Sequence, residues 1–234
     1  MTGPGDPAIA ANLIAVQARI TAAARAVGSD PAAVQLLAVS KTHPAAAVRA
    51  AHSLGQRAFG ENRVQELAAK AAELADLPGL QWHLIGSLQT NKVRDLLAVP
   101  GLALLQSLDR ARLADALQLE LLRQQRRLAV LLQVNASGEA SKHGCSPAEA
   151  PALLDHVLAN CGALDVLGVM AMGPLTGDPR PVFDRTAALR TALQRRSGLL
   201  LPVLSLGMSG DLDAAIAAGS TLVRIGTALF GGRG

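Results

Sequence analysis

Short apolar runs alternate along this chain with longer stretches of helical pattern, and this alternation constrains the fold more than any other feature. Eight such runs are LLAVSK (36–41), AFGEN (58–62), WHLIG (82–86), LALLQSLD (102–109), LAVLLQVN (128–135), LDVLGVMAM (164–172), VLSLGMS (203–209) and TLVRIGTALFG (221–231). Strands separated by helices pair in parallel through right-handed crossovers. Eight units in 234 residues predict an α/β fold of the closed (β/α)8 barrel type rather than an open doubly wound sheet.

The chain shows no sign of division into separate parts. No linker rich in Ser and Gly and no charge run interrupts it, which predicts a single domain over residues 1–234. An alanine-rich amphipathic helix is expected over about residues 7–28, ahead of the first strand. The first strand is not followed by a Gly-x-Gly-x-x-Gly fingerprint, so a dinucleotide-binding fold is disfavoured.

Composition narrows the class of protein. The apolar fraction is 50%, yet no unbroken apolar run has the length of a membrane span, and the N-terminal residues do not resemble a signal peptide. We therefore expect a cytoplasmic protein with no membrane partner. Cys145 and Cys161 match neither a disulfide framework nor a metal-ligand spacing, which agrees with a reducing compartment and predicts no metal site.

The basic charge balance raises the question of a nucleic-acid partner. The formal charge is +4 and the pI is near 9.7. Only 2% of the residues are aromatic, which leaves few platforms for stacking bases, and the basic clusters fall at the ends of predicted helices. We expect no nucleic-acid partner.

The predicted strands begin apolar and end in polar or reactive side chains. These are Lys41, Glu61, Asn62, His83, Gln106, Ser107, Asn135, Met172, Ser205, Ser209, Arg224 and Thr227. In a parallel barrel the carboxyl ends of the strands share one mouth, where active sites lie. Polar strand ends can also serve only to solvate a rim, which accounts for single residues better than for the whole set.

Lys41 is the one lysine of four that ends a predicted buried strand. Partial desolvation there would lower the pKa of the amine and free its lone pair to attack a carbonyl. An ion pair with Glu61 or another carboxylate of the mouth is the alternative. Lys70, four residues after Glu66 in a helical pattern, is expected to form a surface ion pair. Lys142 lies in the loop after the fifth strand.

The last two predicted strands carry the features of an anion site. Small residues that include Ser209 precede a short helix, and Gly226 and Thr227 follow the eighth strand. Phosphate sites of (β/α)8 barrels use the loops after strands 7 and 8, where backbone N–H groups at a helix start face the ligand. In the alternative interpretation Ser209 and Asp211 only cap the helix, which leaves the glycine of strand 8 without a role.

Arg224 lies within the eighth apolar run. A buried guanidinium is costly unless it is paired, so Arg224 is either locked to a carboxylate inside the barrel or directed at a ligand. Pyridoxal phosphate enzymes place an Asp or an Arg opposite the ring nitrogen of the cofactor. An arginine leaves that nitrogen unprotonated, which weakens carbanion stabilisation and predicts limited chemistry or none.

Six segments occur in order from Leu36 to Phe230: AVSKTHP, AFGENRVQE, WHLIGSLQTNK, LLQVNASGEASKHG, LGVMAM and LSLGMSGDLDAAIAAGSTLVRIGTALFG. With these motifs the chain resembles the pyridoxal phosphate homeostasis protein family, which is related to the barrel domain of alanine racemase. The resemblance implies a fold-type III barrel that holds pyridoxal 5′-phosphate as an internal aldimine on Lys41. It further implies that the protein is a monomer.

The resemblance also implies roles for further residues. Ser209, Gly226 and Thr227 would hold the phosphate, Arg224 would face the pyridine nitrogen, Asn62 would lie beside the cofactor, and Lys142 matches a lysine associated with cofactor exchange. The implied role is homeostasis of vitamin B6 and of linked amino-acid and keto-acid metabolism, with no established catalytic turnover and no catalytic residue. His43 stands where the family often has a second lysine, so a lysine-to-lysine transfer at that position is not implied here.

Three alternatives remain open. An amino-acid racemase needs an acid or base on each face of its substrate, and alanine racemases complement the lysine with a tyrosine from a second domain. This chain has no tyrosine, and His83 is expected to be structural. A carrier that delivers the cofactor to apo-enzymes needs only reversible imine formation and an open mouth. An aldolase that forms its imine directly with a substrate is the third alternative.

Overall fold

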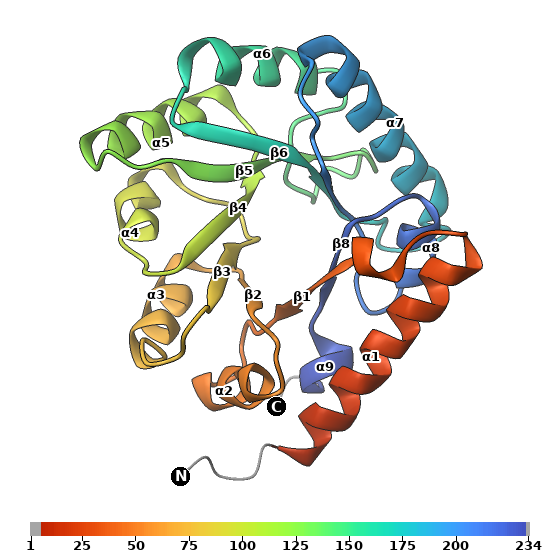
Figure 1. The fold of residues 1–234 in the computed structure, drawn as a ribbon. Helices are drawn as coiled ribbons and strands as arrows, with labels where there is room; N and C mark the ends of the chain where they lie inside the picture. Colours follow the sequence, from red (N-terminus) through yellow and green to blue (C-terminus); the bar gives the residue numbers. More distant parts are fainter. Residues whose placement is uncertain (1–5, 233–234) are drawn as a thin grey trace.

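The computed structural model describes residues 6–232 and shows a closed barrel of parallel strands with helices on the outside (Figure 1). The strands are β1 (Gln35–Val39), β2 (Ala58–Glu61), β3 (Gln81–Leu84), β4 (Leu102–Leu108), β5 (Leu128–Val134), β6 (Leu164–Ala171), β7 (Val203–Ser205) and β8 (Leu222–Ile225). Each strand pairs in parallel with the next, and β8 pairs with β1 to close the barrel. The predicted (β/α)8 barrel is confirmed.

The helices follow the strands in sequence and cover their outer faces. They are α1 (Pro7–Ala26), α2 (Ala45–Ser53), α3 (Val64–Glu73), α4 (Val93–Leu97), α5 (Ala111–Arg123), α6 (Ala150–Asn160), α7 (Arg180–Ser197), α8 (Leu212–Ala217) and α9 (Thr227–Phe230), with short 3₁₀ turns at Pro31–Ala33 and Thr90–Lys92. Gly198 ends α7 with a φ of 73°, a left-handed conformation that glycine adopts without a steric penalty.

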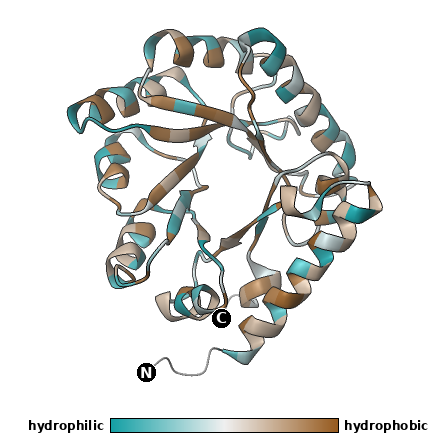
Figure 2. Cartoon of the chain, viewed as in Figure 1, coloured by the Kyte–Doolittle hydropathy of each residue, from teal (hydrophilic) through white to brown (hydrophobic). Residues whose placement is uncertain are grey.

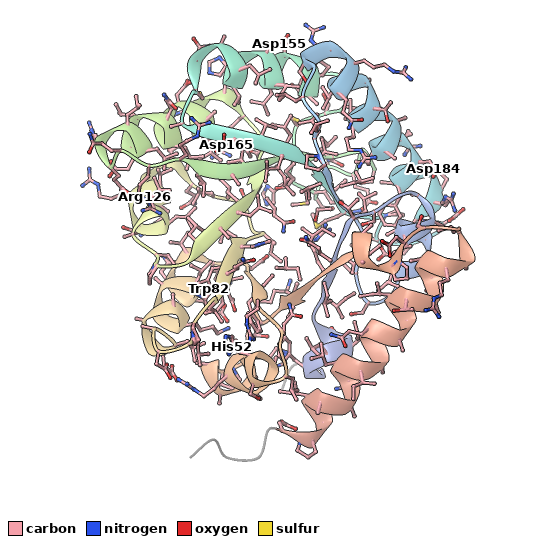
Figure 3. All side chains as sticks on the ribbon, in the orientation of Figure 1. His52, Trp82, Arg126, Asp155, Asp165 and Asp184 are labelled. Carbon is pink, nitrogen blue, oxygen red and sulfur yellow. The ribbon has the colours of Figure 1, made fainter. Side chains whose placement is uncertain are left out.

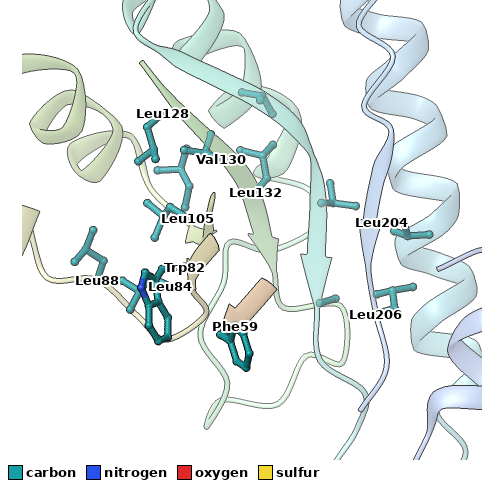
Figure 4. Close-up of a cluster of buried hydrophobic side chains, with 14 of the residues drawn as sticks. Phe59, Trp82, Leu84, Leu88, Leu105, Leu128, Val130, Leu132, Leu204 and Leu206 are labelled. Carbon is teal, nitrogen blue, oxygen red and sulfur yellow. The ribbon is translucent and has the colours of Figure 1, made fainter. Parts of the chain in front are cut away.

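Two apolar layers hold the barrel. The larger layer lies between the strands and the helices, where Phe59, Trp82 and Leu105 pack (Figure 4). Figure 2 shows apolar residues, in brown, along the strands. A smaller cluster fills the inside of the barrel and comprises Leu37, Leu104, Leu131, Met170 and Leu222. Because successive side chains of a strand point to opposite faces, these five residues identify the inward positions of their strands.

Helix α1 packs along the barrel against α8 and α9 (Figure 1). Its buried stripe repeats with helical spacing and consists of Ile9, Leu13, Val16, Ile20 and Ala24. Among residues 6–232, α1 is the one helix whose length and apolar content would allow it to cross a membrane. The packing against α8 and α9 accounts for the five residues of the buried stripe, whereas the apolar Ile14 is exposed.

Several exposed arginines on the helices are paired with carboxylates. Arg196 of α7 contacts Asp155 of α6 at 2.5 Å, and Arg180 contacts Asp184 at 2.9 Å within α7. Figure 3 shows the side chains of Asp155 and Asp184 at the outer edge of the molecule. Such pairs contribute little to stability, but each of them neutralises one positive charge on the surface.

Candidate functional site

The inward positions change from apolar to polar toward the carboxyl ends of the strands. On β8 the inner residue Leu222 is followed two positions later by Arg224, and on β1 the same step from Leu37 leads through Val39 to Lys41. The predicted mouth residues therefore share one end of the barrel. Glu61 is the exception, because its side chain lies on the outer face and binds Lys70 of α3.

Lys41 lies in the turn that follows β1 and is half-buried. Within residues 6–232 its ammonium makes no ion pair or hydrogen bond. The alternative that Lys41 pairs with Glu61 is wrong, because the Glu61 carboxylate accepts hydrogen bonds from Ser40 and Lys70 at 2.7 Å each. An amine at this position is free to react.

Arg224 is buried inside the barrel and is held by neutral groups rather than by a carboxylate. Its Nη1 donates to the carbonyl and hydroxyl oxygens of Ser205 at 2.7 Å each, and its Nη2 donates to the Ala171 carbonyl at 2.9 Å. Burial lowers the pKa of Arg224 to about 10, and the charge of Asp211 opposes this shift. Its third nitrogen, Nε, donates to no described residue and remains available to a ligand.

A chain of hydrogen bonds crosses the barrel from β8 to β3. Ser205 of β7 receives the hydrogen bond from Arg224 and donates to Gln106 Oε1 at 2.7 Å. Gln106 of β4 in turn lies 3.0 Å from Nδ1 of His83. All four side chains are buried, so this series of hydrogen bonds fixes the plane of the Arg224 guanidinium.

The burial of His83 predicts how the free energy of unfolding depends on pH. Burial lowers its pKa from 6.5 to about 4, so the folded protein resists a proton that the unfolded chain accepts below pH 6.5. This contribution to the free energy of unfolding is complete above pH 6.5 and is lost as the pH falls to 4. The expected loss is about 3 kcal/mol.

Chemical denaturation between pH 7 and 4 measures this loss. His83→Gln should flatten the pH dependence, whereas His143→Gln, which alters an exposed loop residue, should keep the wild-type profile. Parallel profiles for the wild type and His83→Gln would show that His83 titrates normally.

The loops after β7 and β8 meet at Ser209. The hydroxyl of Ser209 accepts a hydrogen bond from the backbone N–H of Ala228 at 3.3 Å. The backbone N–H groups of Ser209, Gly210 and Thr227 donate to no other described residue. These donors, together with the two hydroxyls, form the set that a phosphate requires.

Helix capping does not explain Ser209 or Asp211. The first turn of α8 receives no side-chain cap, and the Asp211 carboxylate instead accepts the N–H of Met208 at 2.6 Å. The position of Gly226 favours glycine, because a Cβ there would lie 3.1 Å from the carbonyl oxygen of Val39 on β1. The close backbone approach brings the start of α9 next to the end of β1.

Asn62 follows β2 and is exposed at the mouth. Its backbone is fixed by Gly86, where a Cβ would lie only 2.0 Å from the Asn62 carbonyl oxygen. The approach holds the ends of β2 and β3 together, and it requires glycine because neither backbone can yield cheaply.

Gly86→Ala is therefore expected to displace Asn62 and to destabilise the fold by about 1–3 kcal/mol, as overpacking does. Gly162→Ala is the matched control, since a Cβ at Gly162 meets nothing within 4 Å. Thermal unfolding of both variants measures the difference. Equal melting temperatures would mean that the strand ends separate without cost.

Lys142 lies apart from the residues above and is held in its own loop network. Its ammonium donates to the Gly173 carbonyl at 2.5 Å and to Glu139 at 2.9 Å. These bonds tie the loop after β5 to the loop after β6. No described contact joins Lys142 to Lys41, so its role in cofactor exchange remains a prediction.

His43 packs against a neighbouring ring and is not placed for the exchange role that a lysine would have. Its ring lies 5.2 Å from that of Phe230 in α9. Burial and the nearby charge of Lys70 lower the pKa of His43, against the effect of Glu66. A neutral, packed imidazole at this position suits a contact between the Lys41 loop and α9.

Lys70 is the residue that sequence analysis placed wrongly. It pairs with Glu66 at 2.8 Å as the four-residue spacing predicted, but its side chain is only 8% exposed and also binds Glu61 at 2.7 Å. The spacing on one helix revealed the first partner. The second partner comes from β2, and only the tertiary structure brings it to Lys70.

Cys161 is buried beside the exposed Asp115 and the half-buried His156, with potential ligand atoms within 4.8 Å of one another. The sequence spacing missed this group because Asp115 comes from α5. His156 already pairs with Asp115 at 2.7 Å, and burial raises the pKa of the Cys161 thiol to about 11. A metal ion would have to displace this ion pair and remove the thiol proton in order to bind here.

The donors at the mouth fit one kind of ligand. A free amine, an unused Arg224 Nε and a set of backbone N–H groups match an aldehyde, a ring nitrogen and a phosphate, the three features of pyridoxal 5′-phosphate. The fold and this site define a barrel of the alanine racemase class. The family model for the alanine racemase N-terminal domain matches residues 11–234.

Relatives of higher sequence identity show which family within this class the chain belongs to. The pyridoxal phosphate homeostasis protein of Pseudomonas aeruginosa is 50% identical over 233 residues, which cover 96% of each chain. The human protein of the same name is 42% identical over 236 residues, with 94% of this chain and 85% of the human chain covered. The chain belongs to the pyridoxal phosphate homeostasis protein family.

A solved structure agrees with this assignment. PipY of Synechococcus elongatus, determined with pyridoxal phosphate bound, is 40% identical and superimposes with a TM-score of 0.78 over 92% of this chain and 100% of PipY. Alanine racemase from Corynebacterium glutamicum shares the fold at 19% identity and a TM-score of 0.65, over 96% of this chain and 60% of the racemase.

Proposed function

We propose that the protein binds pyridoxal 5′-phosphate covalently through Lys41 and serves vitamin B6 homeostasis. The observation that carries this proposal is an unpaired, half-buried Lys41 at the end of β1, on the strand next to the buried Arg224. The names of the relatives and the cofactor bound in PipY support it. A monomeric, cytoplasmic protein is part of the same proposal.

Each residue of the mouth has a role in this proposal. Ser209, Gly226 and Thr227 bind the phosphate, the Nε of Arg224 faces the ring nitrogen, and Asn62 lies beside the ring. When bound, the cofactor supplies an aldehyde that condenses reversibly with amines. Lys41 would hold the aldehyde through its unpaired amine, which has to lose a proton before its nitrogen can bind.

The surroundings favour storage over turnover. Arg224 donates to the ring nitrogen and cannot protonate it, so the electron sink that drives carbanion chemistry is weak. A racemase also needs a second acid or base, and this chain has no tyrosine. His83 is kept neutral by burial, which lowers its pKa to about 4, and its Nδ1 is engaged with Gln106. We therefore propose a binding protein without catalytic turnover.

An absorbance spectrum followed by borohydride reduction and peptide mapping tests the proposal. The expected result is a yellow protein whose cofactor becomes fixed to the peptide containing Lys41. A colourless protein that also fails to take up added pyridoxal phosphate would overturn the proposal. In that case Lys41 would bind the substrate of another kind of barrel enzyme, such as an imine-forming aldolase.

Delivery of the cofactor to apo-enzymes is a second candidate function. It is favoured by the exposure of Asn62 and Thr227, which leaves the mouth accessible for exchange. The test mixes loaded protein with an apo-enzyme and compares the gain of activity with that from an equal amount of free cofactor. A gain no faster than with free cofactor rules out direct delivery.

A further inference from the structure

A buried lysine lies directly behind the turn that carries Lys41. The ammonium of Lys70 donates to the Ser40 carbonyl at 2.7 Å, to Glu61 at 2.7 Å and to Glu66 at 2.8 Å. These three acceptors use all three of its protons. Lys70 is thus fully engaged in the wall of the barrel and is not a ligand of the mouth.

The same network holds the chain on both sides of Lys41. On one side, the Ser40 carbonyl accepts from Lys70 and the Ser40 hydroxyl donates to Glu61 at 2.7 Å. On the other side, the backbone N–H of Thr42 donates to Glu66 at 2.6 Å. The two residues that flank Lys41 are therefore anchored to one ion cluster.

Thr42 shows that this anchoring acts against a local preference. Its φ is 68°, a left-handed conformation that is unfavourable for a β-branched residue. Such a residue keeps this conformation only when the surrounding structure imposes it. The Thr42 N–H donates to Glu66, and the His43 N–H donates to the Ser40 carbonyl at 3.0 Å, so both contacts hold the turn in this conformation.

The cluster also keeps two carboxylates away from Lys41. Glu61 is fully buried, and burial raises its pKa, although the hydrogen bonds from Lys70 and Ser40 oppose this shift. For Glu66, burial is outweighed by hydrogen bonds from Lys70 and from the Thr42 N–H, which lower its pKa. With both carboxylates bound to Lys70, neither forms an ion pair with Lys41.

We propose that Lys70 is a positioning residue, which with Glu61 and Glu66 fixes the backbone around Lys41 and leaves the Lys41 amine free for the cofactor aldehyde. This inference rests on the proposed function, since it concerns the geometry and the charge state of the same lysine. A purely structural ion cluster would stabilise the barrel without altering the reactivity of Lys41. The two roles therefore differ in what they predict for covalent attachment.

Lys70→Met separates these roles, because it removes the charge and keeps most of the apolar stem. The rate of covalent attachment of pyridoxal phosphate, followed by absorbance, should fall about tenfold or more, since small misplacements of a reacting group are costly. Affinity for pyridoxine 5′-phosphate, which has an alcohol in place of the aldehyde, should change by less than about twofold. Lys92→Met is the matched control, since within residues 6–232 Lys92 pairs only with Asp95, at 3.0 Å on the surface.

A milder variant covers the case in which Lys70→Met does not fold. Glu66 is 26% exposed, so Glu66→Ala removes the acceptor of the Thr42 N–H while the pair of Lys70 and Glu61 remains. We expect slower covalent attachment in this variant as well. Without cofactor, the segment 39–44 should exchange its amide hydrogens faster than in the wild type, which reports on the backbone directly.

The outcomes distinguish the two levels of the inference. If the wild type attaches the cofactor to Lys41 and both variants do so at the wild-type rate, Lys70 is structural and the positioning role is wrong. A parallel loss of affinity for pyridoxine 5′-phosphate would also contradict it, because the whole mouth would then have collapsed. If the wild type attaches no cofactor, the proposed function itself fails.

Discussion

Lys41→Ala should abolish the covalent attachment of pyridoxal phosphate. No other lysine is placed to substitute for it. Lys70 is enclosed by Ser40, Glu61 and Glu66, Lys142 is engaged with Gly173, and Lys92 pairs with Asp95 on the surface. The variant should therefore show no yellow band at low cofactor concentration and no label after borohydride reduction. Mass spectrometry of the intact reduced protein measures the effect as the loss of one bound cofactor.

Thr227→Ala is the comparison for Lys41→Ala. Thr227 is exposed at the start of α9, and its hydroxyl is one of several donors in the proposed phosphate site. We expect this variant to attach the cofactor to Lys41 but to release it more readily on dialysis, with a loss of affinity of about tenfold for one hydrogen bond to a charged group. Equal loss of covalent label in both variants would contradict the separate roles of the two residues.

Arg224→Glu should allow the ring nitrogen to be protonated and so increase reactivity with amino acids by about tenfold or more. The physical reason is that a carboxyl group in a fully buried position has a raised pKa and can share a proton with the ring, which a guanidinium cannot do. Conversion of the bound aldehyde to the amine after addition of L-alanine, with pyruvate as the second product, measures this reactivity.

The same substitution has a cost in stability. The carbonyl oxygens of Ser205 and Ala171 lose their donor, at about 1–3 kcal/mol for each buried group left unpaired. Reactivity is therefore compared among folded samples only, as judged by circular dichroism. Arg196→Gln, which alters a surface arginine that pairs with Asp155, should leave the reactivity with alanine unchanged. A folded Arg224→Glu protein with wild-type reactivity would mean that Arg224 does not face the ring nitrogen.

Sequence periodicity predicted the barrel because each strand carries its own signal. The run from Leu36 to Lys41 is apolar and ends in a reactive residue, and the same pattern recurs in the other runs, whose strands close the barrel. The inward alternation of Leu222, Arg224 and Gly226 is likewise a local property of β8. For these reasons the fold and the position of the mouth could be predicted without coordinates.

The partners of the charged residues could not be predicted in this way. The spacing of Glu66 and Lys70 indicated an ion pair, but it gave no sign that Glu61 and the Ser40 carbonyl complete the cluster. Arg224 was expected to meet a carboxylate or a ligand, whereas carbonyl oxygens of β6 and β7 hold it. These contacts join residues on different elements, and no local periodicity encodes them.

The sequence by itself determined the barrel and the end at which its mouth lies, because strand alternation and the order of elements are local and repeated. Only the tertiary structure decided which of those residues are free to react. Lys41 and Lys70 carry the same group, yet one amine is unpaired and the other is bound to three oxygens. The difference arises because hydrogen bonds form between atoms within about 3 Å in space, whatever their separation along the chain.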